Sequence, residues 1–309
     1  MRVWIFGAVF GSLVAAFACS SSTTNEASSG GTGGASTGGS GTGAANTGGT
    51  GTGGLAGGGG SLTGGNSGTG GGQSDGGPQC PSGMVAVGTT HCIDATEVTT
   101  GSYAKFLNDV ADAGNITGNS GCSGVTDYAP ASDTGCPVAP YTSDIQLPVR
   151  CVDWCSAYAY CKYAGKRLCG AVPKDSVDPS NATVKGTDQW YTACVGDGAP
   201  EDTYFYGPSF DDTLCQTSTA ATKGPVNVGS KPDCKSHYFK GLVDMTGNIA
   251  EWEDSCDSAT AATAKCLVRG GSHLDGTAAA LSCASVQTAV RTERRSDVGF
   301  RCCWDSVAK

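Results

Sequence analysis

Cysteine content is the feature that most constrains how this chain folds. The 309 residues include 17 cysteines, and every one except Cys19 lies after residue 79. Setting Cys19 aside leaves 16, an even number that permits up to eight disulfides in an oxidising compartment. The cysteine count therefore predicts an exported, disulfide-rich domain, while the connectivity stays open.

The first 19 residues have the pattern of an export signal. Arg2 supplies a positive charge, and the uncharged apolar run over 3–18 is too short for a comfortable membrane span. The run ends in Ala-Phe-Ala before Cys19, a cleavage pattern that is also similar to a bacterial lipobox. We expect residues 1–19 to be a lipoprotein signal peptide and Cys19 to be lipidated, with plain secretion as the alternative. The expected location is the bacterial cell envelope, as an outer-membrane lipoprotein attached to the membrane by its lipid.

Residues 20–79 consist mainly of Gly, Ser, Thr and Ala. Such a stretch buries too little apolar surface to offset the entropy that ordering would cost. We expect a disordered tether with a root-mean-square span of roughly 40–45 Å. It would hold a domain formed by residues 80–309 clear of the membrane.

The charge of the chain argues against one class of partner. The net charge is −9 and no run of Lys or Arg occurs. Phosphate backbones attract basic surfaces, so we expect no nucleic-acid binding.

Short periodic segments predict an α+β domain with many loops. Apolar side chains at helical spacing, such as Tyr103 and Phe106, follow Thr99 or Thr100 as the cap of a first helix. Asp153 is placed to cap a second helix that Gly165 ends. The expected elements are strands at 84–87 and 92–94, helices at 99–110, 153–164 and 188–195, and a loop over 112–146.

Residues 241–252, GLVDMTGNIAEW, place two carboxylates around a turn. A chain that turns at Gly247 and Asn248 would fold Asp244 and Glu251 toward one point. Carboxylates and main-chain carbonyls are the ligands that a hard cation such as calcium prefers. The alternative is a buried turn whose acids are solvated.

Five motifs in order resemble one family. They are IDATEVT at 93–99, AGKRL at 164–168, GLVDMTGNIAEW at 241–252, LVRGGS at 267–272 and VGFRC at 298–302. This series is similar to that of the formylglycine-generating enzyme, or sulfatase-modifying factor, family and covers nearly all of the chain after the tether. The resemblance implies a sulfatase-modifying-factor fold, which is an elaborated C-type-lectin-like fold.

The resemblance also implies chemistry. Members oxidise a sulfatase cysteine to formylglycine with oxygen and copper(I), which two enzyme thiolates hold. The same resemblance implies a calcium site formed by the side chain of Asp244, the carbonyls of Gly247 and Ile249, and the carboxylate of Glu251.

The copper pair is where this chain departs from the family. Asp275 stands at the position of the first thiolate, and Cys283 aligns with the second. Aspartate is a hard ligand that suits copper(I) poorly. Cys283 is therefore either a catalytic thiolate with an unrecognised partner or half of a structural disulfide.

Two functions follow from this departure. The first is a surface-anchored, calcium-stabilised binding module that has lost copper and takes a protein or glycan ligand. The second is a copper-dependent formylglycine-generating oxidase, or a related oxidoreductase, that uses Cys283. Three structural expectations accompany them: Arg269 and Arg301 are buried and paired with Glu251 or Asp254, Cys169 forms a local disulfide, and the adjacent Cys302 and Cys303 have separate partners.

Overall fold

The computed structural model describes residues 79–132, 136 and 144–305. The expected signal peptide, the lipidation site Cys19 and all but the last residue of the expected tether lie outside these ranges. No helix within them is long and apolar enough to cross a membrane.

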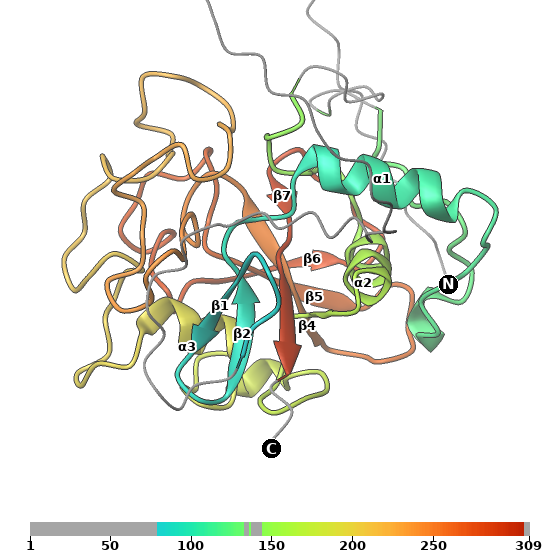
Figure 1. Cartoon of the computed structure of the whole chain (residues 1–309), viewed down its shortest axis with the longest axis horizontal. Coiled ribbons are helices and arrows are strands. Elements are labelled where there is room, and N and C mark those ends of the chain that lie inside the picture. Colours follow the sequence, from blue (N-terminus) through green and yellow to red (C-terminus); the bar gives the residue numbers. More distant parts are fainter. Residues whose placement is uncertain (1–78, 133–135, 137–143, 306–309) are drawn as a thin grey trace, which may run out of the picture. The chain divides into compact units, whose positions relative to one another are not determined.

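Two four-stranded sheets organise the described residues (Figure 1). The first is antiparallel in the order β1-β2-β8-β3, with β1 at Met84–Val87, β2 at His91–Asp94, β8 at Cys302–Asp305 and β3 at Arg167–Leu168. The last strand of the chain thus lies between β2 and β3, which are much earlier in the sequence.

The second sheet has the order β6-β5-β4-β7. Its strands are β6 at Val286–Val290, β5 at Lys265–Arg269, β4 at Ala250–Cys256 and β7 at Val298–Gly299. Only the β4–β7 pairing is parallel, and the β4–β5 register shifts between Trp252 and Cys256. β4 continues directly from the 241–252 motif, so this sheet anchors one end of that motif.

Each α-helix of the described residues directly follows a residue whose side chain caps it. α1, Thr100–Val110, is capped by Thr99, and α2, Trp154–Tyr163, is capped by Asp153. α3, Gln189–Val195, is capped by Asp188. Two single-turn 3₁₀ helices, Ser120–Cys122 and Pro179–Asn181, interrupt the loops.

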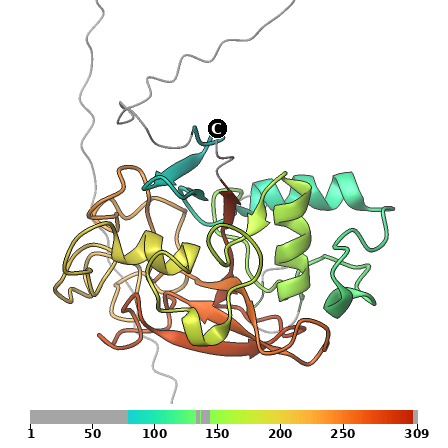
Figure 2. The same cartoon turned by 90° about the horizontal axis from the view of Figure 1, so that it is seen from below.

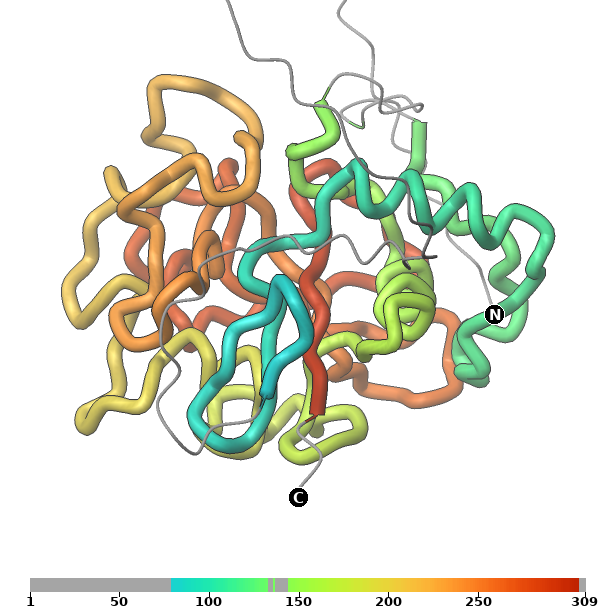
Figure 3. Tube along the Cα trace, viewed as in Figure 1, coloured from blue at the N-terminus to red at the C-terminus, as the bar shows by residue number. Residues whose placement is uncertain are grey.

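Two apolar cores surround the motif. One packs α1 and α2 against β4 and β5 through Phe106, Trp154 and Trp252, and the other gathers around α3 and β2 through Ile93 and Trp190. Figure 2 shows α2 standing over the β4–β5–β6 sheet, with α1 beyond it. Between α3 and β4 the chain, residues 196–249, forms no α-helix or regular strand and runs as loops (Figure 3). The α+β, loop-rich prediction is confirmed.

All sixteen cysteines after residue 79 are paired. The pairs are Cys80–Cys92, Cys122–Cys155, Cys136–Cys151, Cys161–Cys302, Cys169–Cys303, Cys194–Cys283, Cys215–Cys234 and Cys256–Cys266. The adjacent Cys302 and Cys303 have separate partners, as expected.

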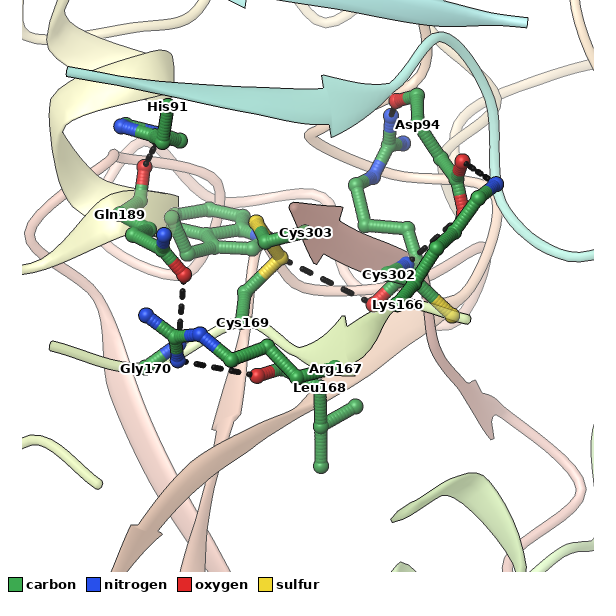
Figure 4. Close-up of a disulfide and its surroundings, with 12 residues drawn as sticks. His91, Asp94, Lys166, Arg167, Leu168, Cys169, Gly170, Gln189, Cys302 and Cys303 are labelled. Carbon is green, nitrogen blue, oxygen red and sulfur yellow. Dashed lines mark hydrogen bonds and ion pairs between the residues drawn. A yellow bond between two sulfur atoms is a disulfide. The ribbon is translucent and has the colours of Figure 1, made fainter. Parts of the chain in front are cut away.

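The local disulfide predicted for Cys169 is wrong. Its partner, Cys303, is 134 residues away and lies on β8, which pairs with β3 immediately before Cys169 (Figure 4). Strand pairing places the two thiols together, and no short-range sequence signal reports it.

Candidate functional site

The turn at residues 244–248 bends through left-handed backbone. Asp244, Gly247 and Asn248 have φ of 56°, 76° and 54°, a region that L-residues other than glycine rarely adopt. A Cβ at Gly247 would lie 2.6 Å from the Gln216 carbonyl oxygen, so glycine is required there for space as well as for conformation. The expected turn at Gly247 and Asn248 is present.

Asp244 is buried beside this turn. Its side chain accepts a hydrogen bond from the Gly229 backbone N–H at 2.5 Å, and the residue is 2 % exposed. Burial, opposed by that hydrogen bond and by the charge of Arg301, raises the pKa of Asp244 to about 6. A positive charge near Asp244 therefore stabilises the ionised form of its carboxyl group.

Glu251 is bound to an arginine. Arg301 Nε lies 2.9 Å from each oxygen of the Glu251 carboxylate, and Trp190 Nε1 donates to Oε2 at 2.8 Å. The other nitrogens of Arg301 donate to the carbonyls of Asp94 and Val243. The predicted Arg301–Glu251 pair is therefore present, and it links β4 to the segment before β8.

Arg269 pairs with Glu253, the residue just before the expected Asp254. Its Nη1 lies 3.5 Å from Glu253 and donates to the Ala182 carbonyl, and its Nη2 donates to the Cys283 carbonyl. The guanidinium lies over the Trp190 ring at 4.9 Å from the ring centre. Glu251 is paired with Arg301 and Asp254 accepts from Ser176, so neither pairs with Arg269 and that part of the prediction is wrong.

Glu97 completes a buried acidic cluster that sequence reasoning missed. It is 1 % exposed, Asn248 Nδ2 donates to its Oε1 at 2.8 Å, and its Oε2 has no hydrogen-bond partner. Burial and then the Asp244 charge raise the pKa of Glu97 well above its usual value. Glu97 belongs to the IDATEVT motif, and its place in that motif is the only sequence feature that could have pointed to it.

The predicted calcium ligands are only partly placed to bind a cation. The Gly247 and Ile249 carbonyls accept no turn or side-chain hydrogen bond within the described residues, and Asp244 lies in the same segment. Glu251, by contrast, directs both oxygens to Arg301. No group of three or more His, Cys, Asp or Glu side chains is arranged for a metal within the described part of the chain.

The segment after LVRGGS carries the two positions, Asp275 and Cys283, that the resemblance aligns with the copper ligands of the family. Asp275 Oδ2 accepts from the Ser272 backbone N–H at 2.9 Å and from its hydroxyl at 3.1 Å, which closes a tight turn. Cys283 is 1 % exposed and is bonded to Cys194 of α3. This bond agrees with the disulfide alternative for Cys283.

Most of the chain matches one protein family. Residues 58–306 match the sulfatase-modifying factor enzyme 1-like domain. The chain belongs to the sulfatase-modifying factor family. The match starts within the Gly-rich segment and includes all five motifs.

Solved structures of similar fold share little sequence with this sulfatase-modifying factor domain. PvdO from Pseudomonas aeruginosa is 17 % identical with a TM-score of 0.48, covering 72 % of this chain and 82 % of its own. CarF is 18 % identical with a TM-score of 0.47, covering 70 % and 86 %. Treponema denticola variable protein 1 is 16 % identical with a TM-score of 0.44, covering 72 % and 87 %. No curated protein matches the chain.

One pocket opens among the loops of this sulfatase-modifying factor domain. Its volume is about 320 Å³, and Asp212, Thr213, Thr219 and Lys231 are among its lining residues. The loop beside it contacts the segment after LVRGGS, where Ser218 N–H donates to the Asp275 carbonyl at 2.9 Å. The pocket loop is therefore linked to the segment after LVRGGS through the neighbour of its lining residue Thr219.

Proposed function

We propose that this protein is a non-catalytic binding module of the bacterial cell envelope. It keeps the sulfatase-modifying factor fold but not the pair of thiolates that copper(I) needs. The disulfide between Cys194 and Cys283 carries this proposal, because a sulfur in a disulfide is not a thiolate ligand. Asp275, at the other position, is a hard oxygen ligand held by Ser272.

The pocket among the loops at residues 212–231 supports a binding role. A volume of about 320 Å³ lies at the lower end of the range for small-ligand sites. Two threonines with Asp212 and Lys231 offer hydroxyls and both signs of charge, which suits a polar ligand such as a glycan or a peptide side chain. Loops on a disulfide-bonded frame are a common way to present such a site.

The proposed function also includes a lipid anchor and a bound calcium ion. Lipidation of Cys19 would attach the protein to a membrane, and residues 20–79 would let the domain reach away from it. Calcium would stabilise the 241–252 segment, for which the sequence names Asp244, Gly247, Ile249 and Glu251 as ligands. The paired cysteines support residence in an oxidising compartment.

A free-thiol count tests the loss of copper chemistry. The exported full chain is alkylated without reduction, digested and mapped by mass spectrometry, and a matched sample is titrated with copper(I). We expect Cys194 and Cys283 to be recovered as one linked peptide, and no copper to bind stoichiometrically. Free thiols at both residues, with one tightly bound copper(I), would overturn the proposal and establish the oxidase alternative.

A further inference from the structure

Asp212 and Lys231 are side chains of opposite charge that line the same pocket. The pocket has a volume of about 320 Å³, and its other lining residues are Thr213, Cys215, Thr219, Ala220 and Ala221. Both charged side chains are half-buried. A charge that is partly shielded from water acts on a bound ligand more strongly than a charge in open solvent does.

These two side chains differ from the other charged groups of the loops over 211–235. The others each have a protein partner: Asp211 accepts from Thr213, Lys223 donates to the Ser218 carbonyl, and Asp233 pairs with Lys235. Within residues 144–305, by contrast, the Asp212 carboxylate and the Lys231 ammonium make no hydrogen bond or ion pair, either with each other or with another group. The acid and the base that remain available to a ligand are therefore the two that line the pocket.

The Cys215–Cys234 disulfide holds the two charged positions near each other. Cys215 follows closely after Asp212 and itself lines the pocket, while the Cys234 N–H donates to the Lys231 carbonyl at 3.0 Å. The Thr217 hydroxyl donates to the Asp212 carbonyl at 3.0 Å. Covalent and hydrogen bonds thus fix the backbone on both sides of the pocket before a ligand arrives, which lowers the entropy that binding costs.

The pair of charges selects among classes of ligand. A neutral sugar would leave both charges unmatched, an anion would be repelled by Asp212, and a cation would be repelled by Lys231. A molecule that carries one ammonium and one carboxylate group matches both charges at once. The volume lies at the lower end of the range for ligand sites, which favours a small molecule.

We propose that this pocket binds a small zwitterion, an amino acid, with the ammonium group of the ligand against Asp212 and its carboxylate against Lys231. The methyl groups of Ala220 and Ala221 line the pocket beside them and suit an apolar substituent. The inference rests on the proposed function, since it names the class of ligand for the pocket of the binding module.

The test uses zwitterions and relatives of them that lack one charge. Binding to the full chain is measured by isothermal titration calorimetry at pH 7 and low salt. The zwitterions are L-alanine and 5-aminopentanoate, which holds its charges further apart. The relatives are L-alaninamide and pentylamine, which lack the carboxylate, and N-acetyl-L-alanine and pentanoate, which lack the ammonium. A neutral disaccharide of N-acetylglucosamine represents a glycan.

We expect one of the two zwitterions to bind with one molecule per chain, and its singly charged relatives to bind at least 10-fold more weakly. Asp212→Asn and Lys231→Gln should each weaken zwitterion binding on the order of 10-fold to 100-fold, since each loses a hydrogen bond between charged groups. The matched controls are Asp233→Asn and Lys235→Gln, which make the same changes of charge at exposed side chains outside the pocket lining. Both controls should keep the affinity of the unmodified protein.

The Asp212→Asn variant also gives a readout that a loss of structure would not produce. Because the acid that recognises the ammonium is gone, this variant should bind the zwitterion and its relative without an ammonium equally well. Its melting temperature should equal that of the unmodified protein, since the Asp212 carboxylate has no protein partner to lose.

Three results would overturn the inference: no binding of either zwitterion, equal binding of the zwitterion and its singly charged relatives, or unchanged affinity in both Asp212→Asn and Lys231→Gln. Binding of the neutral disaccharide in place of the zwitterions would also overturn it, while the binding module itself would stand. Free thiols at Cys194 and Cys283 with bound copper(I) would instead overturn the proposed function, so the two failures are distinguishable.

Discussion

Cys283 is bonded to Cys194, and this disulfide joins the segment after LVRGGS to helix α3. The loop that this pair closes spans 89 residues. Closing such a loop removes much of the entropy of the unfolded chain. The pair therefore contributes to stability where the family resemblance would place catalysis.

Replacing both cysteines by serine tests this role. We expect the Cys194→Ser, Cys283→Ser double variant to lose about 2–5 kcal/mol of unfolding free energy, measured by urea denaturation. Ligand binding in the pocket should persist below the lowered melting temperature. An unfolding free energy equal to that of the unmodified protein would show that the bond does not form.

Gly247 should tolerate no side chain. Gly247→Ala brings a Cβ to 2.6 Å from the Gln216 oxygen at a φ of +76°. Gly165→Ala is the matched control, because its φ is +70° and nothing lies within 4 Å of the added carbon. We expect the control to cost about 1–2 kcal/mol from backbone strain alone, and Gly247→Ala to cost clearly more because of the clash. Equal losses in thermal denaturation would show that the turn relaxes to accept a methyl group.

Arg301 should be essential to the buried cluster. Arg301→Met leaves Glu251 buried without its partner, which we expect to cost about 3–5 kcal/mol of unfolding free energy. The control Lys105→Met removes an exposed ion pair with Asp109 on α1 and should change stability little. Chemical denaturation of both variants measures the difference, and a small loss for Arg301→Met would contradict the pairing.

We expect protonation of the buried His91 to lower the free energy of unfolding at acid pH. Its ring contacts the Gln189 carbonyl at 3.1 Å (Figure 4), and burial, the largest cause, lowers its pKa from 6.5 to about 4. The unfolded histidine therefore takes up a proton at a higher pH than the folded one. The stabilising contribution is complete above pH 6.5 and is lost as the pH falls through 4, by about 3 kcal/mol in all.

The His91 effect is isolated by a difference measurement. Several buried carboxyls, Glu253 among them, have raised pKa values and act in the opposite direction as the pH falls. Subtracting the pH profile of His91→Gln from that of the unmodified protein removes their contribution. A difference that stays constant between pH 7 and pH 4 would contradict the prediction.

Local chemistry made part of the fold predictable. Thr99 and Asp153 cap α1 and α2 because their oxygens accept from backbone N–H groups three residues later, a contact that sequence spacing alone specifies. The motif series likewise predicted the family. Both signals operate within a few residues or match a known pattern.

Contacts between residues that lie far apart in the chain could not be predicted from the sequence. The Cys169–Cys303 pair depends on the pairing of β3 with β8, and the choice of Glu253 for Arg269 follows from the pairing of Glu251 with the distant Arg301. Glu97 was missed because a glutamate in a motif gives no sign that it is buried or that one of its oxygens lacks a partner. These features appear only when distant segments are brought together.

The position of β8 has a consequence for biogenesis. This strand lies between β2 and β3, and its two cysteines close rings of 141 and 134 residues with Cys161 and Cys169. Neither the first sheet nor these cross-links can be completed before residues 302–305 are available to fold. The first sheet must therefore form late in folding, and a chain truncated shortly before Cys302 would leave the thiols of Cys161 and Cys169 unmatched and open to oxidation and mispairing.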